Sequence, residues 1–331
     1  MSARDIIVIG ASAGGVHALT EVVAGLPADL PAAVFAVLHL SPYGKSALPS
    51  ILSRVSTLPS YHPEDGELIR HGRVYVAPPD RHLALEKDRL RLSPGPTENG
   101  HRPAIDVLFR TAAQALGARV IGIVLTGNLD DGTAGLVQVK RHGGIAIVQD
   151  PAEADYPSMP KSALRNVDVD HVLPIAEIGP LLDRLARDPL PAGNPGNGGP
   201  PEAEAADKGR VPADEKEEEA KPSALTCPDC GGCLFESSLN GALHFRCRTG
   251  HAYSPESLVV KQSTSVEAAL WSAIRALEER AALARRIEKR MCDAGSTLSG
   301  DRFSDRARTA ERHAEILRNV LFDAAADPAP D

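Results

Sequence analysis

The stretch Ile6-Ile7-Val8-Ile9-Gly10-Ala11-Ser12-Ala13-Gly14-Gly15 decides the fold of this chain. Its apolar, largely β-branched beginning is typical of a strand that is buried on both faces. Small residues follow, and apolar positions then return at helical spacing from Val16 to Val23. A strand, a tight glycine turn and a helix expose the side chain in the turn and point the N–H groups of the helix toward it. That side chain is Ser12.

Two functions are compatible with a turn of this kind. A dinucleotide-binding turn has the pattern G-x-G-x-x-G, whose second glycine lets the backbone approach the pyrophosphate. Here Ser12 occupies the second position, and residues 31–34, about 20 positions on, offer no acid for a ribose. The alternative is a nucleophile turn, because residues 10–14 fit G-x-S-x-G. A helix cap or a plain small turn residue is the simpler interpretation of Ser12.

Strand-like and helix-like segments alternate through the first 187 residues. We expect further strands at 32–40, 73–77, 120–125, 145–149 and 171–173, helices at 44–54, 103–116, 133–141, 161–166 and 175–187, and a hairpin at 82–92. This alternation predicts an α/β domain over 1–187, a doubly wound and mostly parallel sheet with flanking helices. Functional sites of such sheets lie beyond the carboxyl ends of the strands.

Three polar residues fall at predicted carboxyl ends of this sheet: Ser12, His39 and Asp131. A serine hydroxyl is a poor nucleophile until a base takes its proton and a third group orients that base. Taken alone, His39 is a structural histidine and Asp131, which precedes Gly132, a turn acid or helix cap. Their conjunction with Ser12 favours a serine hydrolase site.

Composition excludes several classes of function. The net charge of −8 argues against a nucleic-acid surface. The chain shows no signal-peptide pattern and no apolar run of about 18 residues, so we expect a soluble, cytoplasmic protein without membrane insertion. Residues 188–223 are rich in Pro, Gly and charge, and 202–221 alone carry eight acidic and four basic residues. This composition predicts a disordered linker.

A third region, 224–258, carries two metal-binding half-sites. Cys227 and Cys230 form C-x₂-C, and after 16 intervening residues Cys247 and His251 form C-x₃-H. Thiolates and imidazole suit tetrahedral Zn²⁺, around which a small module can fold as a zinc ribbon. The alternative is a redox pair or uncoordinated thiols. Spare candidates for the fourth ligand are Cys233 and His244.

The last region, 259–325, is predicted to be a helical hairpin. Apolar residues recur at helical spacing in two stretches, 265–291 and 310–321.

The first region resembles the catalytic domain of the chemotaxis protein-glutamate methylesterases of the CheB type. The resemblance covers residues 5–186 and is carried by four motifs in order: Ile9-Gly10-Ala11-Ser12-Ala13-Gly14-Gly15, Val37-Leu38-His39, Arg102-Pro103-Ala104-Ile105-Asp106 and Leu125-Thr126-Gly127-Asn128-Leu129-Asp130-Asp131-Gly132. It implies a hydrolase that cleaves methyl esters of glutamate side chains on chemoreceptors, releases methanol, often deamidates glutamines too, and needs no cofactor for catalysis.

The resemblance also implies roles for individual residues. Ser12 would be the nucleophile, His39 the base and Asp131 the orienting acid. The backbone N–H groups of Ala13 and Asn128 would form the oxyanion hole.

One loop departs from the family pattern. The family has T-G-M-G-x-D-G, whereas Asn128 and Leu129 here replace the Met and the second Gly. Asn128 keeps the backbone N–H at the Met position, but Leu129 lacks the conformational freedom of glycine, so the family pattern does not fix the shape of this loop.

A methylated chemoreceptor or chemosensory protein is the expected partner, with a sensor kinase or a methyltransferase as further candidates. Two alternative functions stay open: an esterase on small esters with the same triad, and a non-enzymatic docking module whose working part is the zinc-and-helix tail. Family members commonly carry a phosphorylatable receiver domain before the catalytic domain, and none precedes Asp5 here. We therefore expect phosphoryl donors to leave the rate unchanged and the tail to exert any control, with docking of a partner favoured over a lid.

Overall fold

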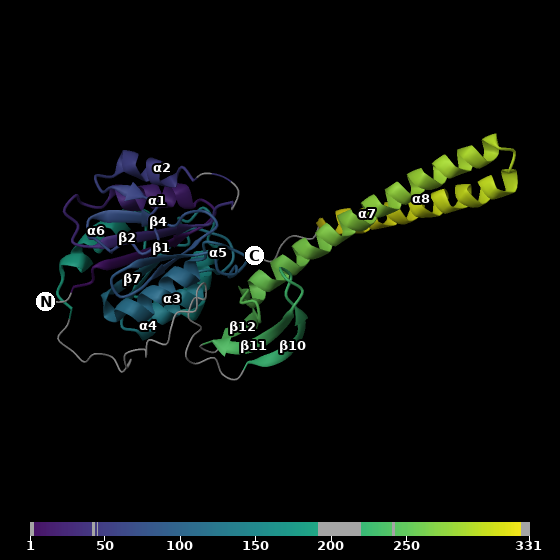
Figure 1. Ribbon diagram of the computed structural model, residues 1–331. Coiled ribbons are helices and arrows are strands. Elements are labelled where there is room, and N and C mark those ends of the chain that lie inside the picture. Colours follow the sequence, from purple (N-terminus) through teal and green to yellow (C-terminus); the bar gives the residue numbers. More distant parts are fainter. Residues whose placement is uncertain (1–2, 42–43, 45, 191–219, 240–241, 326–331) are drawn as a thin grey trace. The chain divides into compact units, whose positions relative to one another are not determined.

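A seven-stranded parallel sheet organises the N-terminal part of the chain (Figure 1). The computed structural model describes residues 3–41, 44, 46–190, 220–239 and 242–325. The strand order is β3 (Ser60–Tyr61), β4 (Arg73–Val76), β2 (Ala33–Leu38), β1 (Ile6–Ala11), β7 (Val120–Val124), β8 (Ile145–Gln149) and β9 (His171–Leu173). All neighbouring strands in it pair in parallel. The prediction of an α/β sheet is confirmed.

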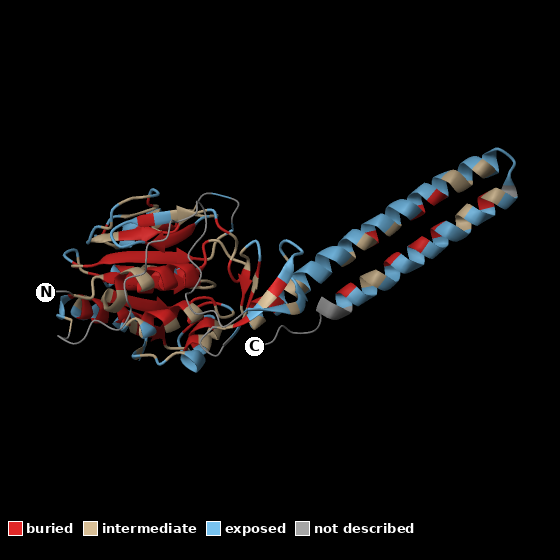
Figure 2. Ribbon diagram, turned by 60° about the horizontal axis from the view of Figure 1, so that its bottom comes forward, coloured by how far each residue is buried: buried red, intermediate tan, exposed pale blue. Residues whose placement is uncertain are grey.

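Helices cover both faces of this sheet. One hydrophobic core lies under α1 (Gly15–Ala24), α2 (Leu48–Val55) and α6 (Ile175–Arg187). The other lies under α3 (Ile105–Leu116), α4 (Thr133–Arg141), α5 (Ser158–Asn166) and the hairpin of β5 (His82–Leu85) and β6 (Leu90–Ser93). A 3₁₀ turn, η1 (Gly117–Arg119), joins α3 to β7. Because both faces are covered, all six residues of β1 are buried, and Figure 2 shows the sheet in the colour of buried residues.

The register of the central strands fixes where the site lies. Ala11 at the end of β1 pairs with Leu38 at the end of β2, and Gly10 pairs with Val124 at the end of β7. The turns that follow these three strands therefore meet at one edge of the sheet. After β1 the chain proceeds to β2 on one side, and it later returns to β7 on the other, which makes β1 the topological switch point where ligands bind in such sheets.

Some element bounds differ from the predicted ones. The helix predicted from residue 103 begins at Ile105, and the helix predicted at 161–166 begins at Ser158. The two-residue strand β3 was not predicted, because so short a segment shows no periodicity.

A four-stranded antiparallel sheet follows in the same compact unit, which spans residues 1–258. Its strands are β10 (Lys221–Thr226), β11 (Cys233–Leu239), β12 (Ala242–Cys247) and β13 (Ala252–Tyr253). We call residues 221–258 the Cys/His module. Most of the predicted linker, 191–219, lies outside the described residues, and β10 begins inside its last part because Lys221 pairs with Glu236.

Residues from 259 onward form a second compact unit. It holds most of α7 (Pro255–Asp293) and α8 (Thr297–Ala325), which confirms the predicted C-terminal helices. Alanines are prominent among its buried positions, and Arg285 binds Glu311 at 3.0 Å across the pair. Within the described part of the chain, every helix is too short or too polar to cross a bilayer.

Candidate active site

Ser12, His39 and Asp131 lie together at the switch point. The Ser12 hydroxyl lies 3.1 Å from His39 Nδ1 and donates to it. On the opposite side of the ring, Nε2–H of His39 donates to Asp131 Oδ2 at 2.7 Å. The ring thus presents a lone pair to the serine while its other nitrogen is held by the carboxylate, as general-base activation of a hydroxyl requires.

Asp131 is almost completely buried, with 2% of its surface exposed. Burial opposes its ionisation, but the hydrogen bond from His39 and the backbone N–H of Ile105 hold its pKa well below the ordinary value. Oδ2 accepts from Ile105 N–H at 2.7 Å, and Oδ1 accepts from Asp106 N–H at 3.2 Å. The carboxylate therefore caps the N-terminus of α3, where the helix dipole favours negative charge. This cap explains why α3 begins at Ile105.

Asp106 also hydrogen-bonds the loop that carries Asp131. Its Oδ1 accepts from the N–H groups of Gly132 and Gly135 at 3.0 and 2.7 Å and so caps α4. Burial and the nearby charge of Asp131 raise the pKa of Asp106. Two helix N-termini and two carboxylates thus fix the position of the loop that carries Asp131.

Glycine allows the turns around Ser12 to approach each other. A Cβ built on Gly127 would lie 2.8 Å from Ser12 Cβ and 2.1 Å from Met159 Sδ. Gly14 adopts φ 73°, in the left-handed region that glycine favours. Ser12 N–H donates to the Thr126 carbonyl at 3.0 Å, and the Thr126 hydroxyl donates to the Ala13 carbonyl at 3.1 Å. The segments bearing the two expected oxyanion donors, Ala13 and Asn128, are therefore joined.

Leu129 adopts φ 65°. This is the left-handed region, which costs a residue with a side chain of the order of 1 kcal/mol. The loop thus keeps a backbone conformation suited to glycine although the sequence supplies leucine.

An open cavity of about 350 Å³ lies beside the serine. It is lined by residues of the Ser12 turn, by His17 and His39, and by three apolar side chains: Val16, Leu38 and Leu40. An open groove with apolar walls can receive a side chain that protrudes from a protein surface.

Sequence reasoning missed two residues that contact the triad. Asn99 Nδ2 donates to Asp131 Oδ1 at 3.1 Å and to Asp106 Oδ2 at 2.9 Å. The His101 ring stacks on the His39 ring with centroids 3.6 Å apart and planes at 9°. Asn99-Gly100 is a turn dipeptide, so the sequence signalled a turn here but not its contacts.

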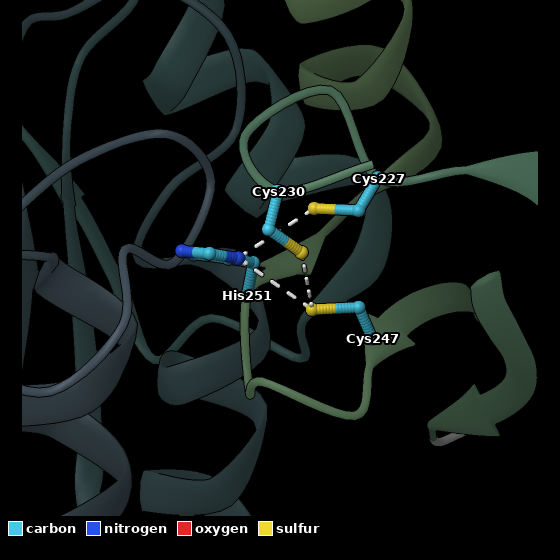
Figure 3. Close-up of side chains that lie close together, drawn as sticks. All are labelled: Cys227, Cys230, Cys247 and His251. Carbon is cyan, nitrogen blue, oxygen red and sulfur yellow. Dashed lines mark hydrogen bonds between the residues drawn. The ribbon is translucent and has the colours of Figure 1, made fainter. Parts of the chain in front are cut away.

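The four metal-ligand candidates converge in the Cys/His module (Figure 3). Their donor atoms all lie within 4.8 Å of one another. The Sγ atoms of Cys230 and Cys247 are 3.7 Å apart, and His251 Nδ1 is 3.6 and 3.5 Å from the Sγ atoms of Cys227 and Cys247. Ligands at tetrahedral Zn²⁺ with bonds of about 2.0–2.3 Å are separated by about 3.5–3.8 Å, so the donor set and spacing fit this metal.

The two spare ligand candidates lie outside that cluster. Cys233 Sγ contacts the carbonyls of Ser223 and Leu234 at 3.8 and 3.4 Å. His244 pairs with Ser237 across β11 and β12, and burial lowers its pKa to about 4.

A parallel α/β sheet with a hydrogen-bonded Ser-His-Asp set at its switch point defines the class of serine hydrolases built on such sheets. Within that class, the sequence profile of the family described as CheB methylesterase matches residues 7–182. The match spans more than half of the chain, and the chain belongs to this family.

Individual proteins similar to this chain have names that match this family. A protein of Leptospira interrogans, provisionally named as a protein-glutamate methylesterase/protein-glutamine glutaminase, is 39% identical over 187 residues, 56% of this chain and 97% of the relative. The protein-glutamate methylesterase/protein-glutamine glutaminase 2 of Methanosarcina mazei is 35% identical over 194 residues, 56% of this chain but 53% of its own length. The crystal structure of the Thermotoga maritima CheB methylesterase catalytic domain matches with a TM-score of 0.54 and 35% identity, over 56% of this chain and all of that one.

Proposed function

We propose that this chain is a serine hydrolase that removes methyl esters from glutamate side chains of a chemoreceptor and releases methanol. The observation that carries the proposal is the hydrogen-bonded series from Ser12 through His39 to Asp131, in a chain of the CheB methylesterase family. The names of the relatives give protein-glutamate methyl esters as the substrate of those proteins and add deamidation of protein glutamines as a second reaction.

In the proposed reaction, His39 Nδ1 takes the proton of Ser12 as its Oγ attacks the ester carbonyl. Asp131 keeps the ring oriented and stabilises the imidazolium that forms. The backbone N–H groups of Ala13 and Asn128 would bind the tetrahedral oxyanion. The imidazolium returns the proton to the departing methoxide, giving methanol, and a water molecule then hydrolyses the acyl-enzyme by the same steps in reverse.

The cavity supports a protein substrate. A glutamyl methyl ester on a receptor helix presents a short apolar side chain at a surface, and the open groove beside Ser12 can admit it without enclosing the backbone. We propose a cytoplasmic site of action on such receptors, with a sensor kinase or methyltransferase of the same system as a further partner.

The proposed metal ion has a structural role and not a catalytic one. Cys227, Cys230, Cys247 and His251 would hold one Zn²⁺, and four protein ligands leave no open position for a substrate. The ion would fix the fold of the Cys/His module and supply no step of the hydrolysis.

Methanol release tests the function directly. The purified full chain would be incubated with membranes that carry a methyl-labelled chemoreceptor, beside Ser12→Ala and beside p-nitrophenyl acetate as a soluble ester. We expect Ser12-dependent methanol release from the membranes. Activity on the soluble ester alone would indicate a small-ester hydrolase, and activity on neither would favour the non-enzymatic docking module.

A further inference from the structure

Residues 97–101 lie between the Cys/His module and the triad, and they contact both. Toward the module, Asn99 N–H donates to the Ala252 carbonyl at 2.8 Å, and Ala252 N–H donates to the Thr97 carbonyl at 3.3 Å. Toward the triad, His101 stacks on His39.

Asn99 is the residue at which these contacts meet. It is 7% exposed and adopts φ 52°, a left-handed conformation that Asn tolerates better than most residues. Its Nδ2 group donates to Asp131 and to Asp106, and its Oδ1 accepts from Ser254 N–H at 3.0 Å. One side chain thus links the catalytic acid, the cap of α4 and the first turn of α7.

The module also reaches the residue next to the catalytic acid. The hydroxyls of Ser254 and Ser257 donate to Asp130 Oδ1 at 2.9 and 3.2 Å. Ser254 Oγ accepts from Ser257 N–H at 3.1 Å, so the residue that caps α7 is the one that binds Asp130.

A buried ion cluster ties the same segment to α3 and to the module. Arg110 binds Glu98 through both guanidinium nitrogens at 3.1 and 2.9 Å, and Arg246 on β12 lies 3.9 Å from Glu98. Loss of Glu98 would remove the carboxylate that both guanidinium groups face, so this cluster holds the segment against α3 and the module.

The metal-ligand cluster is continuous with these contacts. His251 is the residue before Ala252, and its carbonyl accepts from Cys247 N–H at 3.0 Å. The geometry of the four ligands therefore affects the positions of the Ala252 backbone and of Ser254, and both of these residues hydrogen-bond Asn99.

We propose that Asn99 is a positioning residue for the catalytic acid Asp131, and that residues 252–257 of the Cys/His module hold Asn99 in place. The inference builds on the proposed function, since it concerns the same triad. Its consequence is that ligation of the Cys/His cluster controls turnover at Ser12, although no ligand of the cluster contacts the substrate.

Asn99→Asp separates positioning from folding. Aspartate keeps the left-handed backbone and an oxygen for Ser254 N–H, but it replaces the amide donor by a carboxyl oxygen that faces the carboxylates of Asp131 and Asp106. We expect kcat on p-nitrophenyl acetate to fall about 10-fold, the size of a typical coupling between linked sites, with KM changed by less than about twofold. Asn166→Asp, at an exposed asparagine on α5, is the matched control and should leave both constants unchanged.

A second perturbation tests the part played by the module. Chelation of the full chain, or Ser254→Ala with Ser257→Ala, should lower kcat in the wild type by about 10-fold but by less than about twofold in Asn99→Asp, because the linkage is already broken there. Ser263→Ala with Ser272→Ala on α7 is the control pair. Equal losses in both backgrounds, or a rise in KM without a fall in kcat, would overturn the proposal.

Hydrogen exchange at the backbone amides of α3 tests the role of Asn99 without relying on enzyme activity. The N–H groups of Ile105 and Asp106 donate to Asp131, so both should exchange faster when the module is chelated or when Asn99 is changed. If the wild type shows no Ser12-dependent turnover, the proposed function fails and exchange alone decides the inference. Unchanged exchange at these two amides after chelation would refute it.

Discussion

The triad and the Cys/His cluster differ in what holds them, although each gathers residues that are distant in the sequence. Ser12, His39 and Asp131 project from strand ends of a sheet that is buried on both faces by two large apolar cores. Among the described residues of the Cys/His module, the buried apolar core holds six, and two of them are the ligand candidates Cys227 and Cys247.

This difference shows which interactions stabilise the arrangement of the triad and which stabilise that of the Cys/His cluster. At the switch point, burial of apolar strands sets the positions of the polar side chains whether or not a substrate is present. In the module, the apolar core is too small to do this, so the free energy of metal binding is expected to contribute to folding outright. Loss of the nucleophile should therefore leave the sheet folded, whereas loss of a metal ligand should unfold the module.

Ser12→Ala should give the largest effect and leave the fold intact. Removing the nucleophile should abolish turnover, and Asp131→Asn should cost up to about 10⁴-fold in kcat, as in triad hydrolases generally. The melting temperature of Ser12→Ala should match that of the wild type, since Ser12 lies in a turn outside both cores. Ser53→Ala on the exposed face of α2 is the control. Full activity in Ser12→Ala would contradict the assignment.

Loss of one thiolate should unfold the module. Cys247→Ser is expected to reduce bound zinc from one equivalent to none and to increase proteolysis within residues 221–258, while the sheet of β1 to β9 stays folded. Zinc content by elemental analysis and limited proteolysis provide the measurements. Cys292→Ser, which alters an exposed thiol at the end of α7, should keep the metal. Zinc-free wild-type protein purified without chelator would show that the cluster is not a zinc site.

The same contrast explains what the sequence could predict. The sequence could predict that Ser12 and His39 lie near each other, because each follows a run of buried strand residues and the parallel register brings the strand ends together. The four metal-ligand candidates could be predicted because two closely spaced pairs of cysteine and histidine residues are typical of zinc sites.

Contacts made by irregular segments were not predictable. Asn99 and His101 lie in a loop whose position depends on the packing of α3 and of the Cys/His module, and neither packing has a periodic signature. The start of β10 was missed for a related reason: Lys221 belongs by composition to the charged linker, and only its pairing with Glu236 places it in a strand.

Glu98→Gln should reveal how strongly the module and the sheet are joined. Burial opposes ionisation of Glu98, but Arg110 and Arg246 lower its pKa to about 2 from the ordinary 4.5. Because the folded pKa is depressed, its stabilising effect is present above pH 4.5 and is lost as the pH falls toward 2. The variant should melt lower at pH 7, where Arg110 loses the carboxylate of Glu98, and should lose less stability than the wild type between pH 5 and pH 2.5.

Thermal melts at several pH values check this expectation. Glu21→Gln, at an exposed position of α1, is the control and should follow the wild-type curve. Parallel pH curves for wild type and Glu98→Gln would contradict the assigned ion cluster.

Leu129→Gly should have the smallest effect. Glycine removes about 1–2 kcal/mol of left-handed backbone strain, while the freer unfolded chain costs about 0.5–1 kcal/mol. We expect a net gain of about 0.5 kcal/mol, or about 1–2 °C in melting temperature. Leu129→Ala keeps the strain and should show no gain. A clear loss of stability in Leu129→Gly would show that leucine packing outweighs the strain.

The burial of the triad has a consequence for how receptor recognition can be studied. The side chains of His39 and Asp131 are only 6% and 2% exposed, so dissolved ions cannot come between their charges. Salt weakens interactions between exposed charges over a Debye length of about 8–10 Å near physiological strength, and it affects buried pairs far less. Hydrolysis of a neutral soluble ester should therefore hardly change with ionic strength. Any salt dependence that appears only with receptor membranes would then report the charged surface on which the receptor docks.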